Sequence, residues 1–158
     1  MKKGIMTGIS LLAGFAGGAA TVGTVMKRTG SLTNKQSDLY QSCYNIVSQW
    51  LTCKQRGISL DKYFKKKRYY SIAIYGMGRL GSMLYDELKD TDIEIRYAID
   101  QDAYCTCPGL KIVEPDDKLD KVDAIIVTPV LVYDEIQKKL SDKTDIPVIS
   151  IEDVVYGL

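Results

Sequence analysis

The chain has 158 residues, which is room for one ordinary domain with a short appendage. Apolar residues make up 46% of it and charged residues 26%, a composition typical of a folded protein and not of a disordered one. The formal net charge of +1 provides no global basic field, so nucleic acid is not an expected partner.

Cysteine and histidine usage narrows the possible chemistry further. The sequence contains no histidine, which removes the commonest general base and the commonest metal ligand. Of the four cysteines, Cys43 and Cys53 are isolated, and Cys105 and Cys107 lack the second pair that a zinc site needs. We therefore expect no metal site, and a reduced, cytosol-facing domain in preference to a disulfide framework.

The first zone of the chain is an uncharged apolar segment over residues 4–26. As a helix these residues would span roughly 34 Å, enough to cross a hydrocarbon core of about 30 Å. Small residues recur in it at four-residue spacing, for example Gly14 and Gly18, which lets helices approach closely in lipid. We expect residues 1–28 to form a membrane anchor; a cleaved signal peptide and a soluble tail are the alternatives.

The charges that flank this segment predict its orientation. Lys27, Arg28 and Lys35 follow it, which favours a single-pass anchor in the cell membrane with the C-terminal domain in the cytoplasm. Lys2 and Lys3 precede it and oppose that orientation.

Residues 29–68 are expected to form a helical linker region. Apolar positions from Lys35 to Arg56 follow helical spacing, and Gly57 is expected to end that helix. Ser59 is expected to cap a second, short helix. The apolar face that contains Trp50 is expected to pack on the C-terminal domain, with pairing to another subunit as the alternative.

Residues 69–158 alternate between strand and helix patterns. Strands are predicted over 70–75, 93–99, 111–113, 122–127 and 147–151, and helices over 82–89 and 133–140. The 122–127 segment is apolar and β-branched, as in a strand buried on both faces. This alternation predicts an α/β fold, a small Rossmann-like parallel sheet with flanking helices, preceded by a helical segment and the N-terminal apolar helix.

A complete G-x-G-x-x-G motif follows the first predicted strand. In this context Gly76 allows a tight turn, Gly78 lets a pyrophosphate approach the backbone, and Gly81 lets the next helix pack closely on the strand. Amides at the helix start then face the phosphate, assisted by the helix dipole. Arg79 either clamps a phosphate or points to solvent.

Two further segments are expected at the same site. Asp100 ends the second predicted strand, where a carboxylate accepts ribose hydroxyls and repels a 2′-phosphate, which favours NAD over NADP. Thr128 and Pro129 follow the 122–127 strand and are expected to border the crevice. The expected binding residues are therefore Gly76, Gly78, Arg79, Leu80, Gly81, Asp100, Thr128 and Pro129, with no catalytic residue among them.

Residues 69–155, with GMGRLG, YAIDQ, VDAIIVTP and IPVISIED, resemble the Rossmann-like modules of bacterial cell-envelope polysaccharide enzymes. Examples are the N-terminal CoA-binding-like domain of membrane-bound nucleotide-sugar epimerases and dehydratases, and the N-terminal domain of sugar acyltransferases. The resemblance implies binding of NAD or a nucleotide-sugar, with CoA possible, and a glycan-assembly protein as partner. In those relatives the chemistry lies in a separate catalytic domain.

Two functions of different class follow. The favoured one is a membrane-tethered, non-catalytic module that binds NAD or another nucleotide or nucleotide-sugar in polysaccharide metabolism. The alternative is a small NAD-dependent oxidoreductase or epimerase-like enzyme that acts as a homo-oligomer. Tyr85 and Lys89 have the spacing of a tyrosine–lysine acid/base pair, but they follow the glycine turn directly and are expected to be helix surface.

Overall fold

A computed structural model describes residues 36–101 and 109–158 of the chain. The expected membrane anchor over residues 4–26 lies outside the described residues, as do Cys105 and Cys107. Within the two described ranges, no helix has the length and apolar character needed to cross a membrane.

A five-stranded parallel sheet forms the centre of the fold, in the order β3-β2-β1-β4-β5. Its strands are β1 (Ser71–Tyr75), β2 (Glu94–Ile99), β3 (Ile112–Val113), β4 (Ala124–Val127) and β5 (Val148–Ser150). The helices are α2 (Asp61–Lys67), α3 (Arg79–Leu88), α4 (Tyr133–Ser141) and α5 (Ile151–Tyr156), with a short 3-10 turn, η1 (Val130–Val132), before α4. A further helix runs through residues 36–55. The predicted α/β class and parallel sheet are confirmed.

The two central strands are buried on both faces. All four residues of β4 have no exposed surface, and neither do Ile72, Ala73 and Ile74 of β1. Because parallel strands are covered by helices on both sides, their sequences are continuously apolar and do not alternate. The prediction of a doubly buried strand over 122–127 is therefore confirmed for Ala124–Val127.

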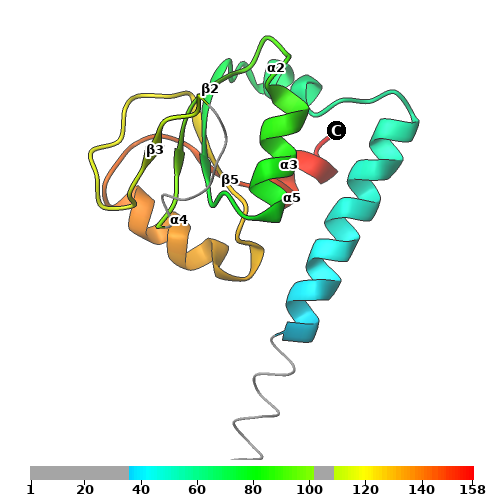
Figure 1. Cartoon of the computed structure of the whole chain (residues 1–158), viewed down its shortest axis with the longest axis horizontal. Helices are drawn as coiled ribbons and strands as arrows, with labels where there is room; N and C mark the ends of the chain where they lie inside the picture. Colours follow the sequence, from blue (N-terminus) through cyan, green and yellow to red (C-terminus); the bar gives the residue numbers. More distant parts are fainter. Residues whose placement is uncertain (1–35, 102–108) are drawn as a thin grey trace, which may run out of the picture. The chain divides into compact units, whose positions relative to one another are not determined.

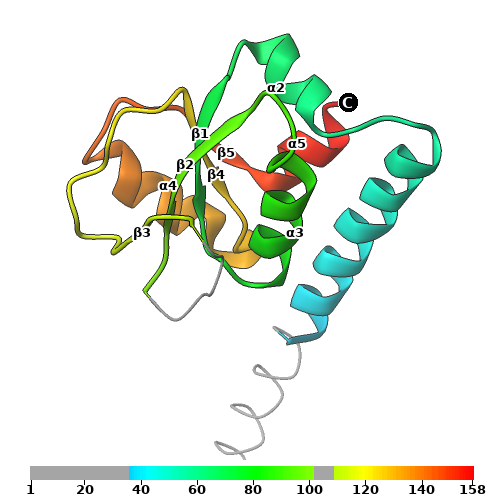
Figure 2. The same ribbon diagram turned by 45° about the horizontal axis from the view of Figure 1, so that its top comes forward.

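Helices cover the sheet in two layers (Figure 1). One face packs against α3 and α5, with Ile74, Leu84 and Val154 in a common core. The other face packs against α4, whose Ile136 and Leu140 contact a second core. Figure 2 shows the same separation from another direction, with α4 on the opposite side of the sheet from α3 and α5.

The helices before β1 belong to the first of these cores. Residues 42–158 form one compact unit, and Ile46 and Trp50 are buried in the same cluster as Phe64 of α2. The expected packing of the Trp50 face on the C-terminal domain is confirmed. The core thus extends beyond residues 69–158 into the segment that was expected to be a linker.

Ser59 does not cap α2, contrary to the prediction. The N-cap position is Leu60, which makes no side-chain cap, and the Ser59 hydroxyl donates instead to Glu87 Oε1 at 2.9 Å. Glu87 also accepts from the Leu60 amide at 3.3 Å and pairs with Lys54 at 2.7 Å. Glu87 therefore joins α3, the start of α2 and the 36–55 helix. Gly57, with φ of +70°, ends that helix as predicted.

The predicted last strand over 147–151 is one residue too long at each end, because β5 begins at Val148 and Ile151 already begins α5. The Ser150 hydroxyl accepts a hydrogen bond from the Glu152 amide at 3.1 Å, and Glu152 and Asp153 occupy the first helical turn. Both features favour a helix start. The sequence prediction missed the helix start because the apolar run PVISI has the pattern of a buried strand.

Asp123 ties the amino ends of β1 and β4 together. Its Oδ2 accepts the amides of Ser71 and Tyr70, each at 2.8 Å. These hydrogen bonds, that of Ser71 first, hold the pKa of the Asp123 carboxyl below its usual value.

Because the folded pKa is lowered, the ionised carboxylate stabilises the fold above the unfolded pKa of about 3.9 and loses this contribution as pH falls through the folded pKa. Asp123→Asn should therefore cost about 0.5–1 kcal/mol at pH 7, since the group is solvent-exposed. The difference from wild type should shrink below about pH 4. Urea unfolding at pH 7 and pH 3 measures both; an equal deficit at the two pH values would contradict the assignment.

Candidate functional site

The strand order places a crevice between β1 and β4. The chain passes from β1 through α3 to β2 on one side of β1, whereas β4 lies on the other side. In open α/β sheets, ligands bind at the carboxyl ends of the strands where the order reverses in this way. A pocket of about 390 Å³ lies there, lined by Tyr75, Gly76, Gly78, Asp100 and Pro129 among others.

Gly76 makes the turn out of β1. Its φ is +87°, a left-handed conformation that other residues rarely adopt. A Cβ here would lie 2.8 Å from the Pro129 ring. The turn is held in place because the Gly76 amide donates to the Ile99 carbonyl at 2.8 Å, and the Gly76 carbonyl accepts from Thr128 Oγ1 at 2.6 Å. Gly76 is thus required by conformation and by packing.

Gly81 is required by close packing alone. A Cβ on this residue of α3 would lie 2.1 Å from the Gly76 carbonyl oxygen, which is backbone and cannot move aside. The predicted role of the third glycine, close approach of the helix to the strand and its turn, agrees with this geometry.

Gly78 differs from both of its neighbours in the motif. Its φ of −66° and ψ of −160° are extended values open to any residue, and an added Cβ would meet no atom within 4 Å. It is the N-cap of α3, yet it supplies no side-chain cap, and the first turn of that helix contains no acidic residue. Neither conformation nor packing within the described residues requires glycine at this position.

Asp100 lies where β2 ends and lines the same pocket. Its Oδ2 accepts the Met77 amide at 2.6 Å. The carboxylate is thereby fixed against the glycine turn, beside the pocket surface that Gly78 leaves open.

The other predicted binding residues have distinct placements. Thr128 is buried, and its hydroxyl holds the glycine turn from behind instead of lining the pocket. Pro129 lines the pocket. The Leu80 side chain is in the core, so only its backbone could face a ligand, while Arg79 is exposed at the start of α3.

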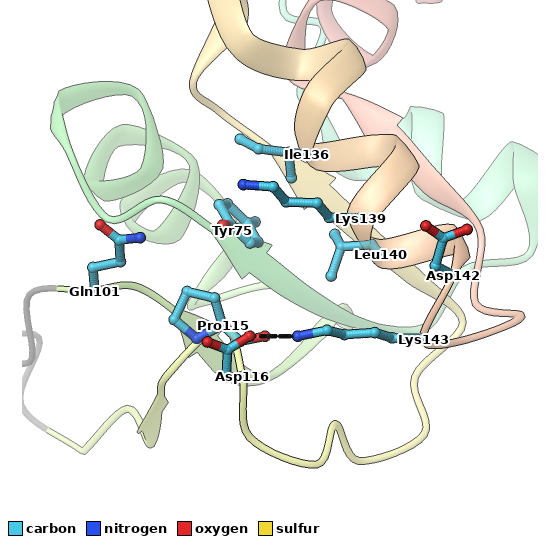
Figure 3. Close-up of a pocket in the computed structure, with 9 residues that line it drawn as sticks. All are labelled: Tyr75, Gln101, Pro115, Asp116, Ile136, Lys139, Leu140, Asp142 and Lys143. Carbon is cyan, nitrogen blue, oxygen red and sulfur yellow. Dashed lines mark hydrogen bonds and ion pairs between the residues drawn. The ribbon is translucent and has the colours of Figure 1, made fainter.

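A second pocket, of about 350 Å³, adjoins the first along α4. The two share Tyr75, Gln101, Ile136 and Lys139, so they form one elongated crevice. Figure 3 shows the Lys139 side chain extending from α4 toward the side on which Tyr75 and Gln101 lie. At the far end Lys143 pairs with Asp116 at 2.6 Å.

Tyr75 lines both pockets. Burial, followed by the nearby Asp100 carboxylate, raises the pKa of the Tyr75 hydroxyl above its usual value. The group is therefore protonated at neutral pH and is available as a hydrogen-bond donor.

The α4 side of the crevice was missing from the sequence prediction. Val132, Glu135, Ile136 and Lys139 line it. Their spacing of three, four and seven residues places them on one helical face, a signal that is present in the sequence. This spacing indicates a wall of the crevice only once β4 is known to lie beside β1. That pairing brings the helix after β4 next to the glycine turn.

The Tyr85 and Lys89 pair lies away from the crevice. Lys89 forms an ion pair with Asp86 at 2.8 Å, and Tyr85 packs partly buried against the core. Lys89, the C-cap of α3, is helix surface as predicted, whereas Tyr85 is half-buried against the core.

The five parallel strands, the switch between β1 and β4 and the glycine turn define a small Rossmann-like domain. The family model described as C2185-like, N-terminal, matches residues 68–151, more than half of the chain, and the protein therefore belongs to this family. The match runs from the residue after α2 to the first residue of α5. Searches of curated proteins and of solved structures found no match.

Proposed function

We propose that the crevice between β1 and β4 binds a nucleotide-containing ligand, with a phosphate group against the N-terminus of α3. The single observation that carries the proposal is the environment of Gly78. Gly76 and Gly81 are explained by the fold itself, whereas Gly78 has ordinary dihedral angles and open space where a side chain would be. The N-cap position favours serine, aspartate or asparagine at least as much as glycine, so capping does not explain why this residue has no side chain. Close approach of a ligand to the backbone does explain it.

The electrostatics of the turn support an anionic group. The N-terminus of an α-helix carries partial positive charge and amides without helical partners, and α3 has no acidic side chain in its first turn to offset them. Arg79 is exposed at the same end. Lys139 adds a second cation on the opposite wall of the crevice, one helical turn from Glu135, which lines the same wall.

Asp100 supports a ribose beside that phosphate. Its carboxylate is held against the turn by the Met77 amide and lines the pocket. A carboxylate at the end of the second strand accepts ribose hydroxyls and repels a 2′-phosphate, which favours NAD-type ligands over NADP. The elongated crevice toward Lys143 offers room for a base or a sugar beyond the ribose.

The physiological role that we propose is that of a membrane-tethered binding module in cell-envelope polysaccharide metabolism. The uncharged segment over residues 4–26 supports the tether. The sequence resemblance of residues 69–155 to modules of polysaccharide enzymes makes NAD and nucleotide-sugars the first ligands to test and CoA the next. No observation on the described residues favours the alternative of an oxidoreductase or epimerase.

Thermal melting of the full chain with NAD, NADP, CoA or UDP-sugars tests the proposal. A ligand that prefers the folded state at one hundred times its Kd adds about 2.7 kcal/mol, which raises the melting midpoint by several degrees. We expect NAD or a UDP-sugar to do so and NADP to do so less. If all four ligand types leave the midpoint unchanged, nucleotide binding is contradicted.

A further inference from the structure

An apolar groove lies between the 36–55 helix and α3, on the far side of the sheet from α4. It has a volume of about 380 Å³ and is lined by the apolar side chains of Val47, Trp50, Leu51 and Met83. Leu51, at the edge of the groove, is 56% exposed. Tyr44, two helical turns before it, is 72% exposed. Tyr44, Val47 and Leu51 follow the spacing of three and four that makes a continuous helical stripe.

The helix that carries the stripe is depleted of charge. Residues 39–53 contain no charged side chain, whereas 26% of the whole chain is charged. A solvent-facing helix normally presents charges on its outer surface. Protein interfaces, in contrast, are depleted of charge and enriched in aromatic residues at their centre. The depletion therefore indicates a covered surface.

We propose that the occupant of this groove is a second copy of the chain, so that two copies pack stripe against groove around a two-fold axis. In such an interface the same patch meets itself, and a protruding residue of each copy enters the groove of the other. Leu51 protrudes beside the groove in the same patch, as this arrangement requires.

The charges at the rim permit self-association. Lys54 pairs with Glu87, and Lys89 pairs with Asp86, so the rim is neutral as a set. A neutral rim can face its own copy without the like-charge repulsion that would penalise a one-sign surface. Such a rim offers no net attraction to a strongly charged partner.

The chain that precedes the helix supplies an independent argument. In the expected membrane anchor over residues 4–26, small residues recur at four-residue spacing, and in a helix embedded in lipid this spacing favours close pairing with a second helix. Seventeen residues separate this segment from Tyr44, where the stripe begins. Pairing there would hold two stripes at high local concentration with the same orientation relative to the membrane. The dimer does not depend on nucleotide binding.

Sedimentation of the full chain in density-matched detergent, over a range of protein concentrations, tests the dimer. Wild type should be dimeric, and Leu51→Glu should weaken association at least about 30-fold, as expected for a central interface residue. Tyr44→Lys is a second variant at an exposed position. Tyr70→Glu changes an exposed aromatic residue away from the groove and should leave the dimer intact.

Each outcome decides the proposal. A wild-type monomer overturns it. A dimer that survives both Leu51→Glu and Tyr44→Lys shows pairing through another segment, such as residues 4–26. That result overturns the assignment of the groove as the dimer interface. Loss of the dimer in Tyr70→Glu as well points to nonspecific apolar contact and overturns it too. Melting midpoints close to wild type show that the groove variants remain folded.

Discussion

Gly81→Ala should destabilise the fold by at least about 3 kcal/mol, which corresponds to a fall of roughly 10 °C in the melting midpoint. The added Cβ would lie 2.1 Å from the Gly76 carbonyl oxygen. That oxygen also accepts the Thr128 hydroxyl, so the turn cannot retreat without breaking a buried hydrogen bond. Either α3 moves away from β1 and opens the core, or the glycine turn rearranges. Urea unfolding and thermal melting measure the cost.

Gly78→Ala is the matched control for Gly81→Ala. It makes the same chemical change three residues earlier, where the Cβ meets nothing within 4 Å. We expect a loss of no more than about 1 kcal/mol, because alanine is a poorer N-cap than glycine. Equal losses in the two variants would contradict the close approach of α3 to the turn.

Gly78→Asp should separate ligand binding from stability. Aspartate is a favourable N-cap, and its charge complements the helix N-terminus, so the free energy of unfolding should stay the same or rise by up to about 1 kcal/mol. The new carboxylate would occupy the open space beside the α3 amides and repel a phosphate there. Affinity for the ligand found by melting should fall at least about 100-fold, as measured by titration calorimetry.

A stable Gly78→Asp variant that binds as tightly as wild type would show that no phosphate approaches this turn. A variant that loses binding only because it unfolds is recognised by its melting curve. Gly78→Ala should give an intermediate loss of affinity, since it adds bulk without charge.

Much of the fold was predictable because its central strands have an unambiguous pattern. The run from Ala124 to Val127 is apolar at every position, and a parallel strand covered on both faces needs that pattern. Elements at the ends were less predictable. The helix α5 has six residues and begins inside an apolar run. The strand-like composition of that run predicted a strand through Ile151, although Ser150 is a favourable helix cap.

The candidate site was predictable only on one side. The glycine motif and Asp100 lie within a single strand–helix–strand unit, where spacing along the chain determines proximity. The α4 wall follows β4, which begins more than forty residues after the glycine turn. Only the pairing of β1 with β4 brings that wall next to the turn. The direction of the Thr128 side chain was not predictable from the sequence either. Thr128 follows the predicted strand as expected, but its hydroxyl is turned to the Gly76 carbonyl.

The most direct test of the nucleotide site is a titration of ¹⁵N-labelled protein with NAD, followed through the backbone amides. The proposed site requires saturable shifts at Gly78, Arg79 and Leu80, with smaller shifts along α4 at Ile136 and Lys139. Residues at the opposite end of the sheet, such as Asp123, should stay unchanged. Saturable shifts confined to other surfaces, or none with NAD and with a UDP-sugar, would contradict the assignment of the glycine turn as a nucleotide site.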